Sequence, residues 1–450
     1  MWSKVTNNSI KNPFQQRVSR RDLMKYGLGA SVLSAVPAQS LLANTSQVRG
    51  NIVIVGAGAG GLALANRLVR RLPNANITIV DSRPQHYYQP GLTMVASGIW
   101  REQEVVSANE RWLPASGMNW IQALATEFDA DNKRIQLSNG ETLHYDYLVV
   151  ATGLQVNYGD IEGFSRDQIG QNGIGCVYDT PEHASKTNNM IRQWIDSGEG
   201  RGLFTLAPTP VKCAGAPLKM TFTTLSRLED TGHRDRYDVQ FMAPGNRVFG
   251  LDFYDDFVKN RWTEQGVTRH DFHRLEAIDG PARQAIFSTP DSGSKTVDYD
   301  FIHVVPPMSA PDPIRHSSLA WQDGPFANEW LEVDQHTMQN PRYPEVFGLG
   351  DVIGAPVNKT AASVKMQTPV VEDNLIAAMT GNELTARHNG YTSCPLITGI
   401  GKAMLVEFGY DGVMLPSFPF INPEEESWAV WIMKDRMLKP AYYAMLEGHI

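Results

Sequence analysis

The chain has 450 residues, of which 42% are apolar and 20% are charged, which excludes collagen-like and disordered classes. Its formal charge of −8 implies no basic face, which argues against nucleic acid as a partner. Only three cysteines occur, too few for a disulfide scaffold, so any pairing between them is expected to be chemical.

The first fifty residues lack the pattern of a folded domain. Arg20 and Arg21 precede a weakly apolar stretch rich in Gly, Ala and Ser. This is typical of a twin-arginine export signal, here over residues 1–43. A membrane anchor is the alternative, but Gly, Ser and Pro interrupt the stretch, and about twenty apolar residues are needed to span a bilayer. We therefore expect a periplasmic protein that lies peripherally on the membrane.

A dinucleotide fingerprint follows the signal. The β-branched run 51–55 predicts a buried parallel strand that leads into a glycine-rich turn and a helix. Gly56, Gly58 and Gly61 permit a tight bend, close approach to a pyrophosphate and close packing of helix on strand. The next predicted strand ends in Asp81, 25 residues beyond the first glycine (81 − 56), where an acid accepts hydrogen bonds from a ribose. This order of elements predicts a dinucleotide-binding domain.

Two later segments favour FAD over NAD as that nucleotide. One apolar strand ends in a small-residue turn at Thr152 and Gly153, and another closes on Gly350 and Asp351. These segments resemble the recurring elements of flavoproteins with two dinucleotide domains. In those proteins the aspartate meets the ribityl chain and pyrophosphate of FAD.

The spacing of these segments fits an α/β fold with two Rossmann-like dinucleotide-binding domains. An FAD-binding domain would comprise residues 50–165 and 329–385, and a second domain over 166–328 would interrupt it. The strand expected to carry the second domain's fingerprint, residues 202–206, runs instead into a proline-rich segment that presents Cys213. Because the pyrophosphate cradle is missing there, NAD(P)H is not expected as the electron donor.

The second informative cysteine, Cys394, lies 181 residues beyond Cys213 (394 − 213), too far for a local redox pair. On residue type alone, a buried inert cysteine is the commoner fate. The chain nevertheless resembles the sulfide:quinone oxidoreductases, in the branch that includes the mitochondrial enzymes, from about Asn51 to Met433. The segments that carry this resemblance are 86–91, 212–219, 303–308, 347–351, 358–362 and 391–399.

This resemblance implies an enzyme that uses FAD to oxidise sulfide and passes the electrons to a membrane quinone. Cys213 and Cys394 would form a redox-active disulfide beside the flavin. Hydrosulfide would attack Cys394, which becomes a persulfide, and the displaced thiolate of Cys213 would pass two electrons to FAD. A sulfane-sulfur acceptor would then remove the sulfur. Lys212 and Lys219 either supply positive charge that favours a thiolate or are solvated surface lysines.

The remaining sequence leaves some alternatives open. Cys176 is either a structural free thiol or a third cysteine that handles sulfur. The histidines show no metal-ligand spacing, so no metal is expected. In the C-terminal region, 386–450, Trp, Tyr and Met at helical spacing with interleaved Lys predict an amphipathic segment that docks on a membrane surface. A core-facing or dimer helix is the alternative, and a homo-oligomer stays open.

Three rival functions are weighed against sulfide:quinone chemistry. The flavoprotein subunit of a flavocytochrome c sulfide dehydrogenase shares the fold, the flavin and the cysteine pair, but the aromatic tail and the cysteine motifs favour a quinone. An NADH:quinone reductase is disfavoured by the missing second fingerprint and by the redox cysteines. From another class, a non-catalytic flavin- or persulfide-binding carrier is the alternative.

Overall fold

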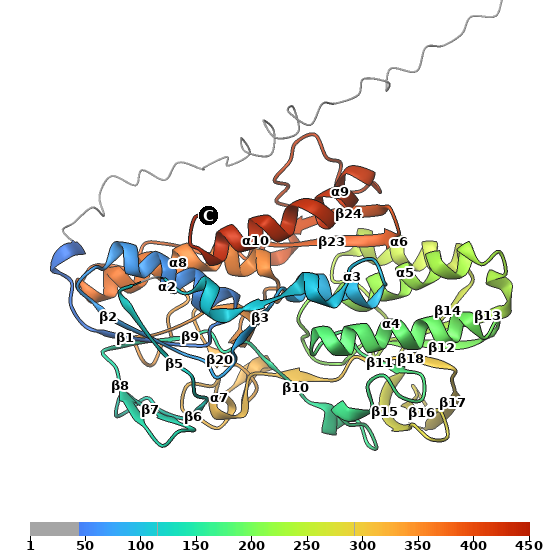
Figure 1. Ribbon diagram of the computed structural model, residues 1–450, viewed down its shortest axis with the longest axis horizontal. Helices are drawn as coiled ribbons and strands as arrows, with labels where there is room; N and C mark the ends of the chain where they lie inside the picture. Colours follow the sequence, from blue (N-terminus) through green and yellow to red (C-terminus); the bar gives the residue numbers. More distant parts are fainter. Residues whose placement is uncertain (1–44, 115, 292) are drawn as a thin grey trace, which may run out of the picture. The chain divides into compact units, whose positions relative to one another are not determined.

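The computed structural model describes residues 45–114, 116–291 and 293–450. The export signal predicted over 1–43 lies outside these residues. Two five-stranded parallel sheets form the core, and the chain returns to the first sheet after it has completed the second (Figure 1). This confirms the predicted α/β fold with two Rossmann-like units.

The first core sheet has five parallel strands with helices packed beside it. Its elements are β1 (Asn51–Val55), β2 (Asn76–Val80), β5 (Met118–Ile121), β9 (Tyr147–Val150), β21 (Val346–Gly348), α2 (Ala59–Arg71) and α8 (Ala361–Met379). The strand order is β21-β9-β1-β2-β5. Helices α2 and α8 pack together, and Arg67 of α2 forms a 2.6 Å ion pair with the buried Glu372 of α8. The carboxyl ends of β1, β9 and β21 therefore meet at one edge.

The second core sheet repeats this arrangement. Its elements are β11 (Ile174–Gly175), β12 (Gly200–Thr205), β13 (Tyr237–Met242), β14 (Val267–His270), β18 (Phe301–His303), α4 (Pro181–Asp196), α5 (Ala216–Asp230) and α6 (Asp252–Glu264). The order is β11-β18-β12-β13-β14, all parallel. Helix α4 packs on β11 and β18, α5 on β12, and α6 on β14.

Two short antiparallel pairs, one short parallel pair (β20 with β22) and two antiparallel three-stranded sheets complete this core. They comprise β3 (Gln85–Tyr87) with β4 (Val106–Ala108), β6 (Ala125–Asp129) with β7 (Arg134–Leu137) and β8 (Thr142–His144), β10 (Gln155–Val156) with β19 (Met308–Ser309), β15 (Arg274–Asp279) with β16 (Gln284–Ser288) and β17 (Ser294–Asp298), and β20 (Leu331–Glu332) with β22 (Ile353–Gly354). Two short helices, α3 (Leu92–Ala96) and α7 (Asp312–Arg315), join them.

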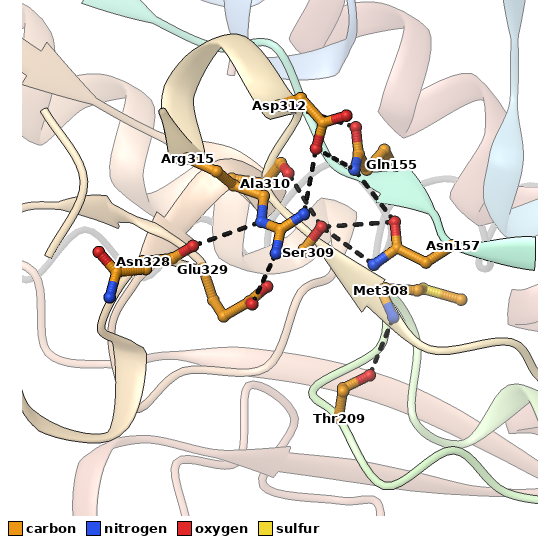
Figure 2. A network of polar contacts seen from close by, with 10 residues as sticks. All are labelled: Gln155, Asn157, Thr209, Met308, Ser309, Ala310, Asp312, Arg315, Asn328 and Glu329. Atoms are coloured by element: carbon orange, nitrogen blue, oxygen red, sulfur yellow. Dashed lines mark hydrogen bonds and ion pairs between the residues drawn. The ribbon is translucent and has the colours of Figure 1, made fainter. Parts of the chain in front are cut away.

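The ribbon of β10 and β19 carries the chain between the two core sheets. Figure 2 shows the polar network around it. The Gln155 amide donates to the Asp312 carboxylate over 2.8 Å, and the Met308 amide donates to the Thr209 hydroxyl over 2.9 Å. Since Thr209 lies in the loop after β12, the ribbon also holds the start of the segment that presents Cys213.

The C-terminal part of the chain adds a hairpin and a helical tail. The hairpin joins β23 (Thr392–Gly399) to β24 (Lys402–Phe408), and β23 packs on α5. The tail consists of α9 (Trp428–Ile432), a π-helical turn (Met433–Met437) and α10 (Leu438–Leu446). Helix α10 packs on α2, which brings the tail to the first core sheet (Figure 1).

Candidate functional site

The three fingerprint glycines meet three different steric requirements. Gly56 has φ of +108°, and a Cβ there would lie 2.3 Å from the carbonyl oxygen of Ala151. A Cβ on Gly61 would lie 1.8 Å from the carbonyl oxygen of Gly56, so helix and strand are in contact there. A Cβ on Gly58 would meet only the guanidinium of Arg83, at 3.9 Å, which leaves the open space that a pyrophosphate needs. This cradle fits a dinucleotide.

Asp81 lies at the end of β2 as predicted, but its carboxylate already has partners. It accepts hydrogen bonds from the Ala57 amide at 2.7 Å and from the guanidinium of Arg83, also at 2.7 Å. Burial opposes ionisation, but Arg83 and Ala57 outweigh it and lower the pKa of Asp81. Asp81 therefore joins the glycine turn to Arg83, a residue that sequence reasoning missed. Arg83 lies beyond the end of β2 at Val80, and no local pattern indicates this pairing.

The other predicted cofactor residues gather at the same edge of the sheet. Thr152 and Gly153 follow β9, and Gly350 and Asp351 follow the adjacent β21. Gly153 and Gly350 have φ of +71° and +81°, which glycine adopts without strain. The Gly350 amide donates to the side chain of Gln367 in α8 over 2.8 Å. Burial raises the pKa of Asp351, although lysines nearby oppose the rise.

The structure brings the two predicted cysteines together. Cys213 lies in the loop between β12 and α5, where a nicotinamide domain carries its glycines. Cys394 lies on β23, opposite Val406, and its side chain hydrogen-bonds to that of Cys213. A Cβ on Gly215 would lie 2.9 Å from the sulfur of Cys394, so this glycine allows the approach. All three cysteines of the chain are free thiols in this structure.

The two sulfur atoms have opposite electrostatic environments. The hydrogen bond from Cys394, and then the ammonium of Lys219 at 3.3 Å, lower the pKa of Cys213 well below its usual range despite burial. The same hydrogen bond and burial raise the pKa of Cys394. Burial alone would lower the pKa of Lys219, but the neighbouring Cys213 thiolate raises it overall. These surroundings favour the thiolate at Cys213 and the protonated thiol at Cys394.

Two further lysines lie at this centre. Lys434, in the π-helical turn, is 2% exposed and donates to the Pro90 carbonyl over 2.5 Å; burial, and then Lys219, lower its pKa to about 7. Lys359 precedes α8, and burial lowers its pKa to about 7 against the opposing charge of Asp351. Lys434 belongs to the C-terminal segment in which the sequence predicts interleaved lysines at a membrane interface. Its burial is a difference from that prediction, and no local signal in the sequence indicates it.

Neither Lys212 nor Cys176 has a hydrogen bond to the sulfur of Cys213 or Cys394 among the described contacts. The half-buried Lys212 donates to the side chain of Gln89 over 2.8 Å, so it is neither a free surface lysine nor a direct partner of the sulfur. Cys176 is fully buried, its amide donates to the hydroxyl of Thr187 over 2.9 Å, and burial raises the pKa of its thiol to about 12. A thiol this weakly acidic is suited to packing rather than to sulfur transfer.

The C-terminal tail is partly packed and partly exposed. Tyr442 of α10 is hydrogen-bonded to the ring of His86 at 2.7 Å, and the Tyr443 ring stacks on Trp112 with centroids 4.5 Å apart. Trp428 is 68% exposed and Met437 38% exposed. One face of the tail therefore packs on the protein, as in the core-facing alternative, while Trp428 and Met437 are exposed and membrane docking stays a prediction. In the described residues, no helix is long and apolar enough to cross a bilayer.

Comparison with known proteins gives consistent similarities. Residues 50–190 match the model of the pyridine nucleotide-disulphide oxidoreductase family. The mitochondrial sulfide:quinone oxidoreductase of Mus musculus is 34% identical over 88% of this chain and 86% of the relative. That of Dictyostelium discoideum is 34% identical over 94% and 90%. The structure of the Aquifex aeolicus sulfide:quinone oxidoreductase has a TM-score of 0.73 at 20% identity, over 89% and 92%, and shows the same fold.

These relatives overturn the predicted periplasmic location, which is wrong. Both are named as mitochondrial proteins, and they point to mitochondria instead. The physical reason lies in the composition of the N-terminus. Residues 1–21 contain five Lys or Arg and no acidic residue, and a basic, acid-poor segment is typical of mitochondrial transit peptides as well. The pair Arg20–Arg21 therefore does not discriminate between the two.

Proposed function

Because this chain belongs to the sulfide:quinone oxidoreductase family, we propose that it oxidises sulfide to sulfane sulfur and passes the electrons to a quinone. The observation that carries the proposal is the hydrogen bond between the side chains of Cys213 and Cys394, with the Lys219 ammonium 3.3 Å from the sulfur of Cys213. A carrier needs no such polarised pair. The loop that holds Cys213 has no glycine cradle, so sulfide rather than NAD(P)H supplies the electrons.

The flavin in this proposal is FAD. Gly56, Gly58 and Gly61 would hold its pyrophosphate at the start of α2, and the Gly350–Asp351 turn would bind from the neighbouring strand. The Gly58 position supports this fit, since no side chain atom of the described protein fills the space over it within 3.9 Å. When bound, the flavin supplies a two-electron oxidant for the cysteine pair.

The cysteine chemistry follows from the two environments. In the oxidised pair, the sulfur atoms of Cys213 and Cys394 are joined. Hydrosulfide attacks the sulfur of Cys394, a new S–S bond forms there, and the bond to Cys213 breaks. Cys394 then carries a persulfide, and the electron pair of the broken bond leaves on Cys213. Lys219 favours attack at Cys394 rather than at Cys213, because its ammonium stabilises the thiolate that Cys213 becomes when the bond breaks. A sulfane-sulfur acceptor removes the outer sulfur from Cys394.

The quinone reaches the protein from a membrane surface in this proposal. Trp428 and Met437 supply exposed apolar side chains on the tail, while α10 is fixed to the first core sheet. Co-sedimentation with liposomes should fall when Trp428→Ser is introduced. Equal binding of the variant and the unmodified chain would argue against docking through this tail.

The decisive experiment is anaerobic stopped-flow absorbance of the flavin-loaded protein. Sulfide should bleach the flavin and a short-chain quinone should restore it at once. Cys394→Ser should abolish the bleaching by sulfide while the flavin stays bound. Unchanged bleaching in this variant would refute the cysteine mechanism. Bleaching that quinone does not reverse would favour a cytochrome acceptor, as in the flavocytochrome c sulfide dehydrogenases.

A further inference from the structure

Cys213 has a backbone conformation that other parts of the protein must hold in place. Its φ is +52°, in the left-handed region that non-glycine residues seldom adopt. Such a conformation persists only where the surroundings determine it. Two contacts hold its carbonyl: the Ala216 amide donates to it over 2.7 Å, and the Tyr178 hydroxyl lies at 3.4 Å. A third contact holds its amide, which donates to the carbonyl of Lys359 over 2.9 Å.

That third contact comes from a distant part of the chain. Cys213 follows β12 of the second core sheet, whereas Lys359 lies between β22 and α8, beside the first core sheet. Lys212 and Lys359 pair as an isolated parallel bridge, so the two backbones run side by side at this point. The cysteine loop is therefore bonded to the segment that follows the Gly350–Asp351 turn.

The side chain of Lys359 contacts that turn. Its ammonium donates to the carbonyls of Asp351 and Ile353 over 2.8 and 2.9 Å, and it lies 3.6 Å from the ring centroid of Trp330. The residue is only 7% exposed. Two hydrogen bonds from its side-chain nitrogen and one contact with an aromatic ring therefore hold this buried lysine in place.

We propose that Lys359 is a positioning residue that fixes the position of Cys213 relative to the Gly350–Asp351 turn. Its carbonyl holds the cysteine amide in the left-handed bend, and its ammonium holds the turn that would bind the flavin. The distance between the reactive sulfur and the flavin site is then set by one residue that contacts both segments. Only the catalytic consequence of this role rests on the proposed function.

The test is hydrogen–deuterium exchange of the flavin-loaded full chain, read by mass spectrometry. In Lys359→Met, amide exchange should quicken at least about tenfold both in peptides that cover Gly350–Ile353 and in peptides that cover Cys213. Lys365→Met removes an exposed lysine of the same region and should change neither. Lys359→Arg keeps a charged donor and should restore most of the protection at both segments.

Faster exchange at Gly350–Ile353 alone, with wild-type exchange around Cys213, would refute the proposal, since it would show a purely local role. If Lys359→Met does not fold, Lys359→Gln keeps a neutral donor and is judged by the same two peptides. A catalytic readout is added by the long-wavelength charge-transfer absorbance of the sulfide-treated protein. That band should weaken in Lys359→Met at unchanged flavin content. If the unmodified protein does not respond to sulfide, the proposed function fails, while the exchange data still decide the role of Lys359.

Discussion

Replacing Lys219 by methionine tests whether the charge beside Cys213 makes it a thiolate. The ammonium lies 3.3 Å from the sulfur; Lys219 is buried and Cys213 is half-buried. Two unit charges at that distance attract by about 5 kcal/mol at an effective dielectric constant of about 20. The contacts of Cys213 with Cys394, and the charge of Lys434, remain in the variant and retain part of the stabilisation. We therefore expect a loss of about 3 kcal/mol, roughly a hundredfold in thiolate population below the titration midpoint.

The assay is alkylation of Cys213 by iodoacetamide as a function of pH, followed on the peptide that contains it. Removal of Lys219 takes away a positive charge, so the pKa of Cys213 must rise and alkylation near neutral pH must slow. Lys219→Arg keeps the charge and should stay close to the unmodified protein. Lys212→Met removes a lysine from the same loop that is bonded to Gln89 instead, and should have a much smaller effect. An identical alkylation midpoint in Lys219→Met would refute the reasoning.

Two further predictions concern the cradle and a buried histidine. Gly58→Ala should lower flavin occupancy at least about tenfold with little change in Tm. Gly61→Ala should not fold, because its Cβ would lie 1.8 Å from the carbonyl oxygen of Gly56. Equal losses of flavin and of stability in the two variants would disprove these roles. Burial lowers the pKa of His303 from 6.5 to about 3, so between these values the unfolded chain binds a proton that the folded chain lacks. The free energy of unfolding should then fall by up to about 1.4 kcal/mol per pH unit below pH 6.5. Urea unfolding at pH 7 and pH 5 should show a smaller loss of unfolding free energy for His303→Leu than for the unmodified protein. Equal losses in the two proteins would contradict this prediction.

The parallel strands and the glycine turn could be predicted because their causes are local. The strand expected at 51–55 is β1, Asn51–Val55, and the strand expected at 202–206 is β12, Gly200–Thr205. Buried β-branched runs bounded by turn residues need no distant information to be recognised. The steric roles of the glycines likewise follow from the bond geometry of the turn itself.

The details of the candidate site could not be predicted because they depend on contacts between distant segments. The partner of Cys213 arrives on a hairpin that packs on α5, and its amide is held by Lys359. The left-handed bend at Cys213 has no local signature, since Cys is not a residue that favours it. The burial of Lys434 depends on how α9 and α10 fold back on the protein. From the sequence it was possible to predict which residues belong to the candidate site, but not which atoms each of them contacts.

The long separation between the two cysteines has a consequence for biosynthesis. When Cys213 leaves the ribosome, Cys394 is still 181 codons away (394 − 213), and Lys434 follows 40 codons later (434 − 394). Lys219, six residues beyond Cys213 (219 − 213), is made almost at once, so part of the stabilisation of a thiolate is encoded locally. The hydrogen bond from Cys394 and the charge of Lys434 are added only after the hairpin and the tail have been made and have docked. The full polarisation of the cysteine pair therefore forms late in synthesis.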